Sequence, residues 1–337
     1  MNNKQYFPQI DILKGLAILS VLLLHSLERD ELLSSFSIFH IWQAVPIFLV
    51  LMGFNLGMST NGKHFQLTEL YDRSYFFKKG SRIVTPILIA YVASLITGGI
   101  WYVATGEDPF IFKGYTAIGM LPVPGKGNYF VTLVLQSILL LPVIGYGLYY
   151  KPWLSATILV IAEISFLIIS KNIAFFVEER YLYDAAFLRY LSAVALGYGL
   201  VHLVKYKNGF GLLLLVTGAV ISALYLYFDI YTDFDVQYIR PEWEAQNFMA
   251  FPYAALFVYV GFKLFPATIN NVFVQVLVEI GKASFHIFLV QVIYFGLAEP
   301  EWPLWLNLLT CTSIGYIFYQ YETPIANATV LLWKKKK

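Results

Sequence analysis

Three ionisable side chains interrupt the first long apolar stretch of the chain, residues 10–27: Asp11, Lys14 and His25. Successive residues of an α-helix turn by about 100°, so Lys14 and His25, eleven positions apart, fall on one face of a helix about three turns from each other. Ionisable groups at membrane depth are costly unless they meet a partner or a polar cavity, and they therefore indicate a functional site. The alternative is a lysine that reaches the interface and a histidine that is hydrogen-bonded to a neighbouring helix.

A histidine inside a helical bundle has the chemistry of a general base or of a nucleophile. Because the ordinary pKa of histidine is about 6.5, a neutral ring is available near neutral pH, and it can take a proton from a hydroxyl or attack an activated acyl group. The sequence does not choose between these roles for His25. Asp11 lies three residues before Lys14, so Lys14 either pairs with Asp11 or contacts a ligand.

A second cluster, formed by Lys78, Lys79 and Arg82, precedes the third apolar stretch. If the helix begins early, Lys79 and Arg82 are three positions apart and share a face. Arginine binds phosphate through two parallel hydrogen bonds and lysine adds a point charge, so the pair suits a phosphorylated ligand. The alternative is that these residues anchor the chain to anionic lipid at the inner membrane surface.

Polar residues also occur in the last two apolar stretches. Ser284, His286 and Gln291 share one of them, which predicts a helix that faces the interior of a bundle, although hydrogen bonds between helices alone would explain Ser284 and Gln291. Glu322 lies near the end of the last stretch, where it either pairs with Lys14 or the second cluster or is an ordinary interfacial acid. The histidines show no metal-ligand spacing, and we expect no metal site.

The elements that carry these residues are predicted to be membrane-spanning helices. Of 337 residues, 58% are hydrophobic and 13% charged, whereas soluble domains carry about a quarter charged residues. Only helices or closed barrels satisfy their backbone in lipid, and barrel strands alternate rather than run apolar. We therefore expect an all-α polytopic membrane protein of about ten spans, with approximate limits 10–28, 38–58, 83–103, 128–148, 153–170, 185–204, 210–228, 248–265, 272–297 and 303–321.

Charge asymmetry predicts the orientation of the spans. When both termini are placed in the cytoplasm, most lysines and arginines fall on the inner side and most acids on the outer side. We expect one membrane domain over residues 1–337, with the first helix retained and no appended soluble domain. The segment 324–337 is too short to span and suits an interfacial segment with a basic end. The single cysteine, Cys311, excludes an intrachain disulfide.

Three predicted outer loops are long enough to matter, and the loop 171–184 holds Glu178, Glu179 and Arg180. Residues 106–127 are rich in glycine and proline, which indicates a partly re-entrant loop. The loop 229–247 mixes acidic residues with Tyr231, Phe234, Tyr238 and Trp243. Aromatic faces and carboxylates suit polyhydroxylated ligands, but an aromatic belt at the membrane interface explains the same composition.

Five motifs in order resemble the membrane acyltransferase 3 family over essentially the whole chain. They are Asp11–His25, with Lys14, ten residues and His25; Pro46–Phe54, with Met52 where serine is usual; Lys79–Pro86, which resembles R-x-x-R-x-x-P but has lysine for the first arginine and one more residue before the proline; Gly281–Gln291, with Phe285 for a tyrosine and Gln291 for a final histidine; and Glu322–Pro324, resembling E-x-P.

The resemblance implies a ten-helix fold and transfer of an acyl group, usually acetyl, from cytoplasmic acyl-CoA to a carbohydrate hydroxyl at the outer face. We expect no permanently bound cofactor, with acyl-CoA as donor substrate, a carbohydrate or lipid-linked glycan as acceptor, the bacterial cytoplasmic membrane as location and no nucleic-acid partner. An exporter or flippase of a lipid-linked glycan and a non-catalytic scaffold are the alternatives. The expected roles are catalysis for His25, donor binding for Lys14, Lys78, Lys79 and Arg82, and support for Asp11, Ser284, Gln291 and Glu322.

Overall fold

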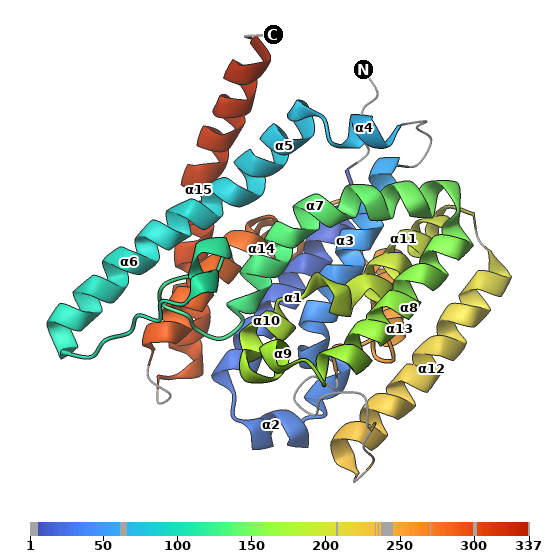
Figure 1. Ribbon diagram of the computed structural model, residues 1–337, viewed down its shortest axis with the longest axis horizontal. Helices are drawn as coiled ribbons and strands as arrows, with labels where there is room; N and C mark the ends of the chain where they lie inside the picture. The colour runs from blue at the N-terminus through green and yellow to red at the C-terminus, as the bar shows by residue number, and fades with distance from the viewer. Residues whose placement is uncertain are drawn as a thin grey trace. The chain divides into compact units, whose positions relative to one another are not determined.

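The computed structural model describes residues 6–60, 66–206, 208–232, 234, 236, 245–269, 271–298 and 302–335. Within these ranges every regular element is helical (Figure 1). The prediction of an all-α polytopic membrane protein is confirmed.

Eight helical segments of the described chain are long and apolar enough to cross a membrane, and they coincide with eight of the ten predicted spans. They are Pro8–Ser26 (α1), Ser37–Thr60 (η1 Ser37–Phe39, η2 Ile41–Gln43, α3 Ala44–Thr60), Arg73–Thr105 (α5 Arg73–Lys79, η3 Gly80–Val84, α6 Thr85–Thr105), Tyr129–Tyr150 (α7), Pro152–Ser170 (α8), Phe187–Tyr206 (η5 Phe187–Tyr190, α11 Leu191–Tyr206), Gly209–Tyr231 (α12) and Val272–Leu297 (α14).

The other two predicted spans are helical but have different lengths. Predicted span 248–265 corresponds to α13, Phe251–Leu264, whose 14 residues are about 21 Å long and shorter than a bilayer core. Predicted span 303–321 is the first part of α15, a single helix over Leu304–Lys335. The helix continues beyond residue 321, the predicted limit of the span, because Pro324 removes one backbone hydrogen bond and disturbs the helix without ending it.

Short helices occupy several of the connections. They are α2 (Arg29–Ser34), α4 (Leu67–Leu70), η4 (Gly114–Ile118), α9 (Ala174–Glu178) and α10 (Arg180–Asp184).

The chain forms two compact units, and each is described by itself. Unit 1 comprises Met1–Lys63, Gly147–Glu179 and Leu188–Lys282. Unit 2 comprises His64–Tyr146, Arg180–Phe187 and Ala283–Lys337. Two of the boundaries between the units fall inside α7 and α14. A single functional domain over residues 1–337 stays a prediction.

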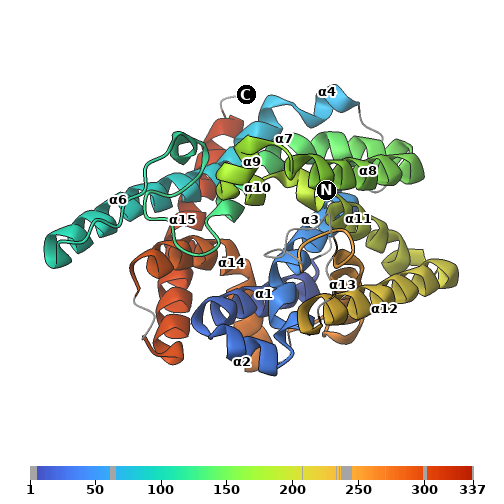
Figure 2. The ribbon, with the colours of Figure 1, turned by 60° about the horizontal axis from the view of Figure 1, so that its bottom comes forward.

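Unit 1 is built around the crossing of α3 and α11, which lie side by side in Figures 1 and 2. A Cβ atom added at Gly53 would overlap the Val194 carbonyl oxygen, and one added at Gly197 would overlap the Val50 carbonyl oxygen. The two backbones therefore touch directly, and packing of this kind takes the place of hydrophobic burial between helices in lipid.

The variant Gly197→Ala is expected to lower the free energy of unfolding by about 2 kcal/mol, because a side chain there forces two close-packed backbones apart. Gly199→Ala is the matched control, since it lies on the same helix and no heavy atom comes within 4 Å of its added Cβ. Thermal unfolding of both variants in one detergent measures the difference. Equal melting temperatures for the two would contradict the crossing.

Glu163 is a fully buried carboxylate that the sequence left without a partner. Its Oε2 accepts a hydrogen bond from the backbone N–H of Ser192 at 2.7 Å, in the first turn of α11. The first N–H groups of a helix have no partner within the helix and carry partial positive charge. Glu163 on α8 therefore caps α11 from a neighbouring helix.

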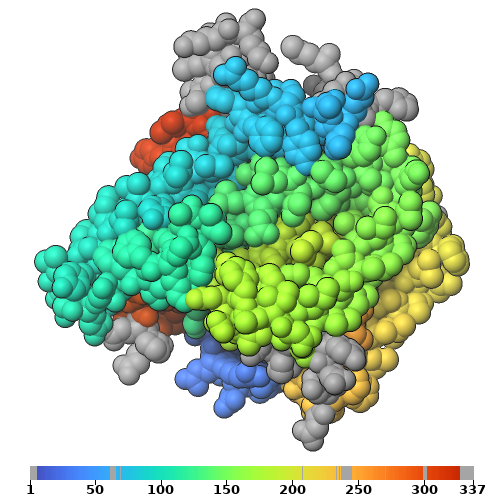
Figure 3. Space-filling model, in the orientation of Figure 1, coloured from blue at the N-terminus to red at the C-terminus, as the bar shows by residue number. Residues whose placement is uncertain are grey.

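In unit 2, α6 lies at the surface, within the turquoise region of Figure 3, and it has an apolar exposed flank. The exposed side chains of this flank include Leu88, Val92, Ile96, Ile100 and Val103. An apolar flank of this length is costly in water and suits lipid tails. The long helix Arg73–Thr105 thus presents lipid-compatible surface along α6, while its polar beginning carries the basic residues.

Candidate functional site

The face of α1 that carries Lys14 and His25 is buried between these two residues. Ile18 and Val21, which lie between them on this face, are 0% and 3% exposed. His25, near the C-terminal end of α1, is half-buried. Lys14 and His25 are separated by about 16 Å along the helix axis. The histidine therefore lies at the end of an interior face rather than on a flank directed to lipid.

Lys14 forms an ion pair with Asp11. Its Nζ donates to Asp11 Oδ1 at 3.1 Å, and the Tyr6 hydroxyl donates to Asp11 Oδ2 at 2.9 Å. Of the two roles left open for Lys14, the structure shows the pairing with Asp11. The lysine side chain remains 29% exposed, so a further ligand can still approach it.

Two glycines bring the first part of α14 against α1 in unit 1. A Cβ at Gly15 would overlap the Leu277 carbonyl oxygen, and one at Gly281 would overlap the Asp11 carbonyl oxygen. Gly281 begins the motif of the ninth predicted span, and its close approach to α1 gives that glycine a physical role. The Asp11–Lys14 pair therefore lies on α1 where Gly15 and Gly281 allow the backbones of α1 and α14 to touch.

In unit 2, the basic residues lie on a continuous helical run that begins at Arg73, ten residues before the predicted start of the third span. Between α5 and α6 the helix widens into a π-helical turn over Gly80–Val84, in which the Thr85 N–H bonds to the Gly80 carbonyl. Pro86 explains the widening, because it lacks an N–H and its ring clashes with a carbonyl four residues back. Turns of this kind often occur at functional sites.

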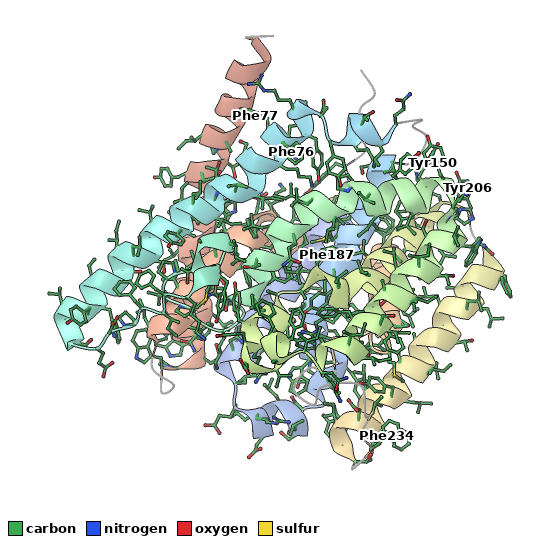
Figure 4. The ribbon with its side chains drawn as sticks, viewed as in Figure 1. Phe76, Phe77, Tyr150, Phe187, Tyr206 and Phe234 are labelled. Atoms are coloured by element: carbon green, nitrogen blue, oxygen red, sulfur yellow. The ribbon has the colours of Figure 1, made fainter. Side chains whose placement is uncertain are left out.

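We call residues 78–82 the basic turn. Lys78 and Arg82 are exposed and Lys79 is partly buried, with its Nζ 5.9 Å from the centre of the Tyr75 ring. Lys79 and Arg82 are close enough for their charges to interact. Figure 4 labels Phe76 and Phe77, which immediately precede the basic turn on α5. Three cations within five residues repel one another, and an anion bound among them would relieve that repulsion.

The basic turn is anchored to two other helices of unit 2. On one side, the Tyr75 hydroxyl donates to the Ile138 carbonyl of α7 at 2.7 Å, and the Tyr71 hydroxyl donates to the Leu139 carbonyl. Pro142 has no N–H to offer the Ile138 carbonyl, so Tyr75 satisfies an acceptor that α7 leaves open.

On the other side, Ser81 Oγ donates to the Ala326 carbonyl of α15 at 3.0 Å. Sequence reasoning missed Ser81 and Tyr75 as supports of the basic turn. Pro142 inside an apolar stretch was the available signal for a free carbonyl on α7, whereas nothing in the sequence pointed to the contact with α15.

Glu322 pairs with His286. The distance from His286 Nε2 to Glu322 Oε2 is 3.1 Å, and both side chains are buried. The partners expected for Glu322, Lys14 or the second cluster, are not the one that the structure shows, because α15 carries the Glu322 carboxylate against α14, where His286 lies. Ser284 is buried two residues before His286 on the same helix.

Gln291 holds the segment before α7. Its Nε2 donates to the Lys126 carbonyl at 3.1 Å, and the Val123 N–H donates to Ser94 Oγ, in the middle of α6, at 2.9 Å. Leu121 and Val123 are fully buried. The segment 119–128 therefore turns back to the level of mid-helix residues, as the predicted re-entrant loop does.

The predicted outer loop 229–247 is described only in part. Residues 233, 235 and 237–244 of this loop lie outside the described residues. The predicted carbohydrate-facing residues Tyr238 and Trp243 are among them, so their role stays a prediction.

Comparison with known proteins identifies the chain by its family. The family model of an acyltransferase domain, that of the acyltransferase 3 family, matches residues 7–331, which is nearly the whole chain. No curated protein and no solved structure matches the chain.

Proposed function

Since the chain belongs to the acyltransferase 3 family, we propose that this membrane acyltransferase moves an acyl group, most simply acetyl, from cytoplasmic acyl-CoA to a hydroxyl of an extracytoplasmic carbohydrate. The observation that carries the proposal is the interior face of α1, which holds a histidine at the end of a membrane-length helix. The bacterial cytoplasmic membrane is the proposed location.

The reaction needs a group that manages one proton. The acceptor oxygen forms a bond to the acyl carbon as the carbon–sulfur bond of the thioester breaks. In the general-base route, His25 takes the hydroxyl proton and returns it to the departing sulfur, which leaves CoA as the thiol. In the nucleophilic route, a nitrogen of His25 first bonds to the acyl carbon as the carbon–sulfur bond breaks, and the acceptor oxygen then bonds to that carbon as the carbon–nitrogen bond breaks. The hydroxyl proton again ends on the CoA sulfur. Both routes require the ring of His25.

The donor brings several phosphate groups that are costly to transfer into lipid. Lys78, Lys79 and Arg82 supply a cationic surface for them, with Arg82 exposed and able to bind two phosphate oxygens at once. The Lys14–Asp11 pair retains an accessible ammonium group that suits a further contact with the donor.

The supporting residues act through packing. Gln291 anchors the segment 119–128, which lies before α7, and Glu322 joins α15 to α14. We propose that these contacts keep the donor-binding and acceptor-facing surfaces in place and do not themselves touch the reacting atoms.

Incubation of the purified protein with radiolabelled acetyl-CoA and a membrane glycan fraction tests the proposal. Acetyl transfer predicts base-labile label on the glycan by either route, and the nucleophilic route also predicts label on the protein when the acceptor is left out. A glycan exporter would move the glycan and leave it unlabelled, and that result would overturn the proposed function.

A further inference from the structure

We propose that the buried His286–Glu322 pair is a positioning pair that fixes the basic turn by holding α15 against α14. The inference rests on the proposed donor-binding role of the basic turn, and it assigns to His286 a role that the sequence left open. All the contacts that carry it lie within unit 2.

The pair is difficult to replace once it is formed. His286 and Glu322 are 8% and 5% exposed at their side chains, and they share one contact of 3.1 Å. Within the described chain, the other two polar atoms of the pair, His286 Nδ1 and Glu322 Oε1, have no hydrogen-bond partner. Loss of either residue therefore leaves a buried polar group unsatisfied, which is more costly than the bond itself. The rings of Phe318 and Tyr319 pack edge-on against the His286 ring, with ring centres 4.8 and 5.4 Å from its centre.

One stripe of α15 faces α14 and the basic turn. Cys311, Gly315, Glu322 and Ala326 are all buried, and their spacing of four, seven and four residues puts them on one side of the helix. A Cβ at Gly315 would overlap the backbone of Ile287, so α14 and α15 touch directly beside His286. The pair therefore sets the rotation of α15 at a point where there is no side-chain layer to absorb a shift.

The same stripe reaches the basic turn one helical turn later. Ala326 follows Glu322 by four residues, about 6 Å along the axis, and its carbonyl accepts the hydrogen bond from Ser81 at 3.0 Å. Ser81 lies between Lys79 and Arg82. A rotation of α15 would thus carry Ser81 and the neighbouring cations with it.

Pro324 lies between these two contacts. Because it has no N–H, the helix lacks the backbone hydrogen bond to the Gln320 carbonyl. Because the backbone hydrogen bonding of α15 is interrupted at Pro324, the position of the last part of the helix depends on the contacts of Glu322 and Ala326. His286 and Glu322 therefore act on the donor through the basic turn and not by touching it.

The test uses a cysteine reporter at Ala326→Cys in a Cys311→Ala background, both in the full chain. The reporter is buried in the parent, so its maleimide labelling is expected to be slow. Glu322→Ala is expected to speed labelling about tenfold, and Glu322→Gln, which can still accept from His286, is expected to restore protection. The matched control is Tyr294→Phe, which removes the 2.7 Å hydrogen bond to Asn307 between the same two helices, far from the basic turn.

Binding of radiolabelled acetyl-CoA gives the second readout, without the reporter. Glu322→Ala removes the contact of α15 with His286, and Ser81→Ala removes the contact of α15 with the basic turn. Each is expected to weaken acetyl-CoA binding about tenfold, whereas Tyr294→Phe is expected to leave it unchanged. Ser81→Ala also serves if Glu322→Ala fails to fold.

Equal labelling of the reporter in Glu322→Ala and Tyr294→Phe, or unchanged binding in Ser81→Ala, would overturn the inference. A parent protein that binds no acetyl-CoA would instead contradict the proposed donor site, and the labelling experiment would still decide whether the pair positions α15.

Discussion

His25→Ala is expected to lower acyl transfer by about 10²–10⁴-fold, the range that general acid–base groups contribute, while the protein accumulates normally. The ring lies at the end of the interior face of α1 and is half-buried, so its removal leaves the packing of Ile18 and Val21 intact. The measurement is the rate of acetyl transfer from acetyl-CoA per molecule of protein in membranes. Both the general-base and the nucleophilic routes predict the loss.

His40→Ala is the matched control for this experiment. His40 is exposed, lies outside the α1 face, and is held by a 3.0 Å contact between its Nε2 and the Ser35 carbonyl. Full activity is expected for this variant. A normal rate of acyl transfer in His25→Ala would show that His25 is not required for the reaction. Acetyl label trapped on wild-type protein without acceptor, and absent from His25→Ala, would favour the nucleophilic route.

Arg82→Ala is expected to raise the KM for acetyl-CoA by about 10- to 100-fold, with a smaller change in kcat. A hydrogen bond to a charged group contributes about 1.5–3 kcal/mol, and each 1.4 kcal/mol is a factor of ten in affinity. Arg82 is exposed, so the substitution removes a ligand contact at little cost to packing. Steady-state kinetics at varied acetyl-CoA concentration separate the two constants.

Arg73→Ala removes the same charge from the beginning of α5, nine residues earlier, and is expected to leave KM unchanged. Added salt should weaken donor binding by the parent more than by Arg82→Ala, because exposed charges are screened. Donor binding that is unchanged in Arg82→Ala would assign the basic turn to lipid anchoring.

The membrane helices could be predicted from the sequence because long apolar runs have few other solutions in lipid. The interior face of α1 followed from the helical repeat, since Lys14, Ile18, Val21 and His25 recur on one side. The prediction that Lys79 and Arg82 share a helix face depended on an early start of the third helix. Gly80 and Pro86 are usual signs of a helix boundary. Here Pro86 widens the helix and does not stop it.

Contacts between helices could not be predicted, because they depend on packing that a single sequence does not show. Charge complementarity pointed Glu322 towards lysine or arginine, whereas the close approach of α14 and α15 at Gly315 brings it to His286. Glu163 had no partner in sequence because its acceptor role is directed at a backbone N–H of another helix. Backbone donors carry no residue-type signal.

Inverted membrane vesicles, with the cytoplasmic face outside, give the most direct measurement of acyl transfer across the membrane. Radiolabelled acetyl-CoA added outside the vesicles is expected to yield ester-linked label on carbohydrate in the lumen, and His25→Ala vesicles are expected to yield none. Carbohydrate that reaches the lumen equally in both vesicles and carries no label in either would contradict acyl transfer and establish export instead.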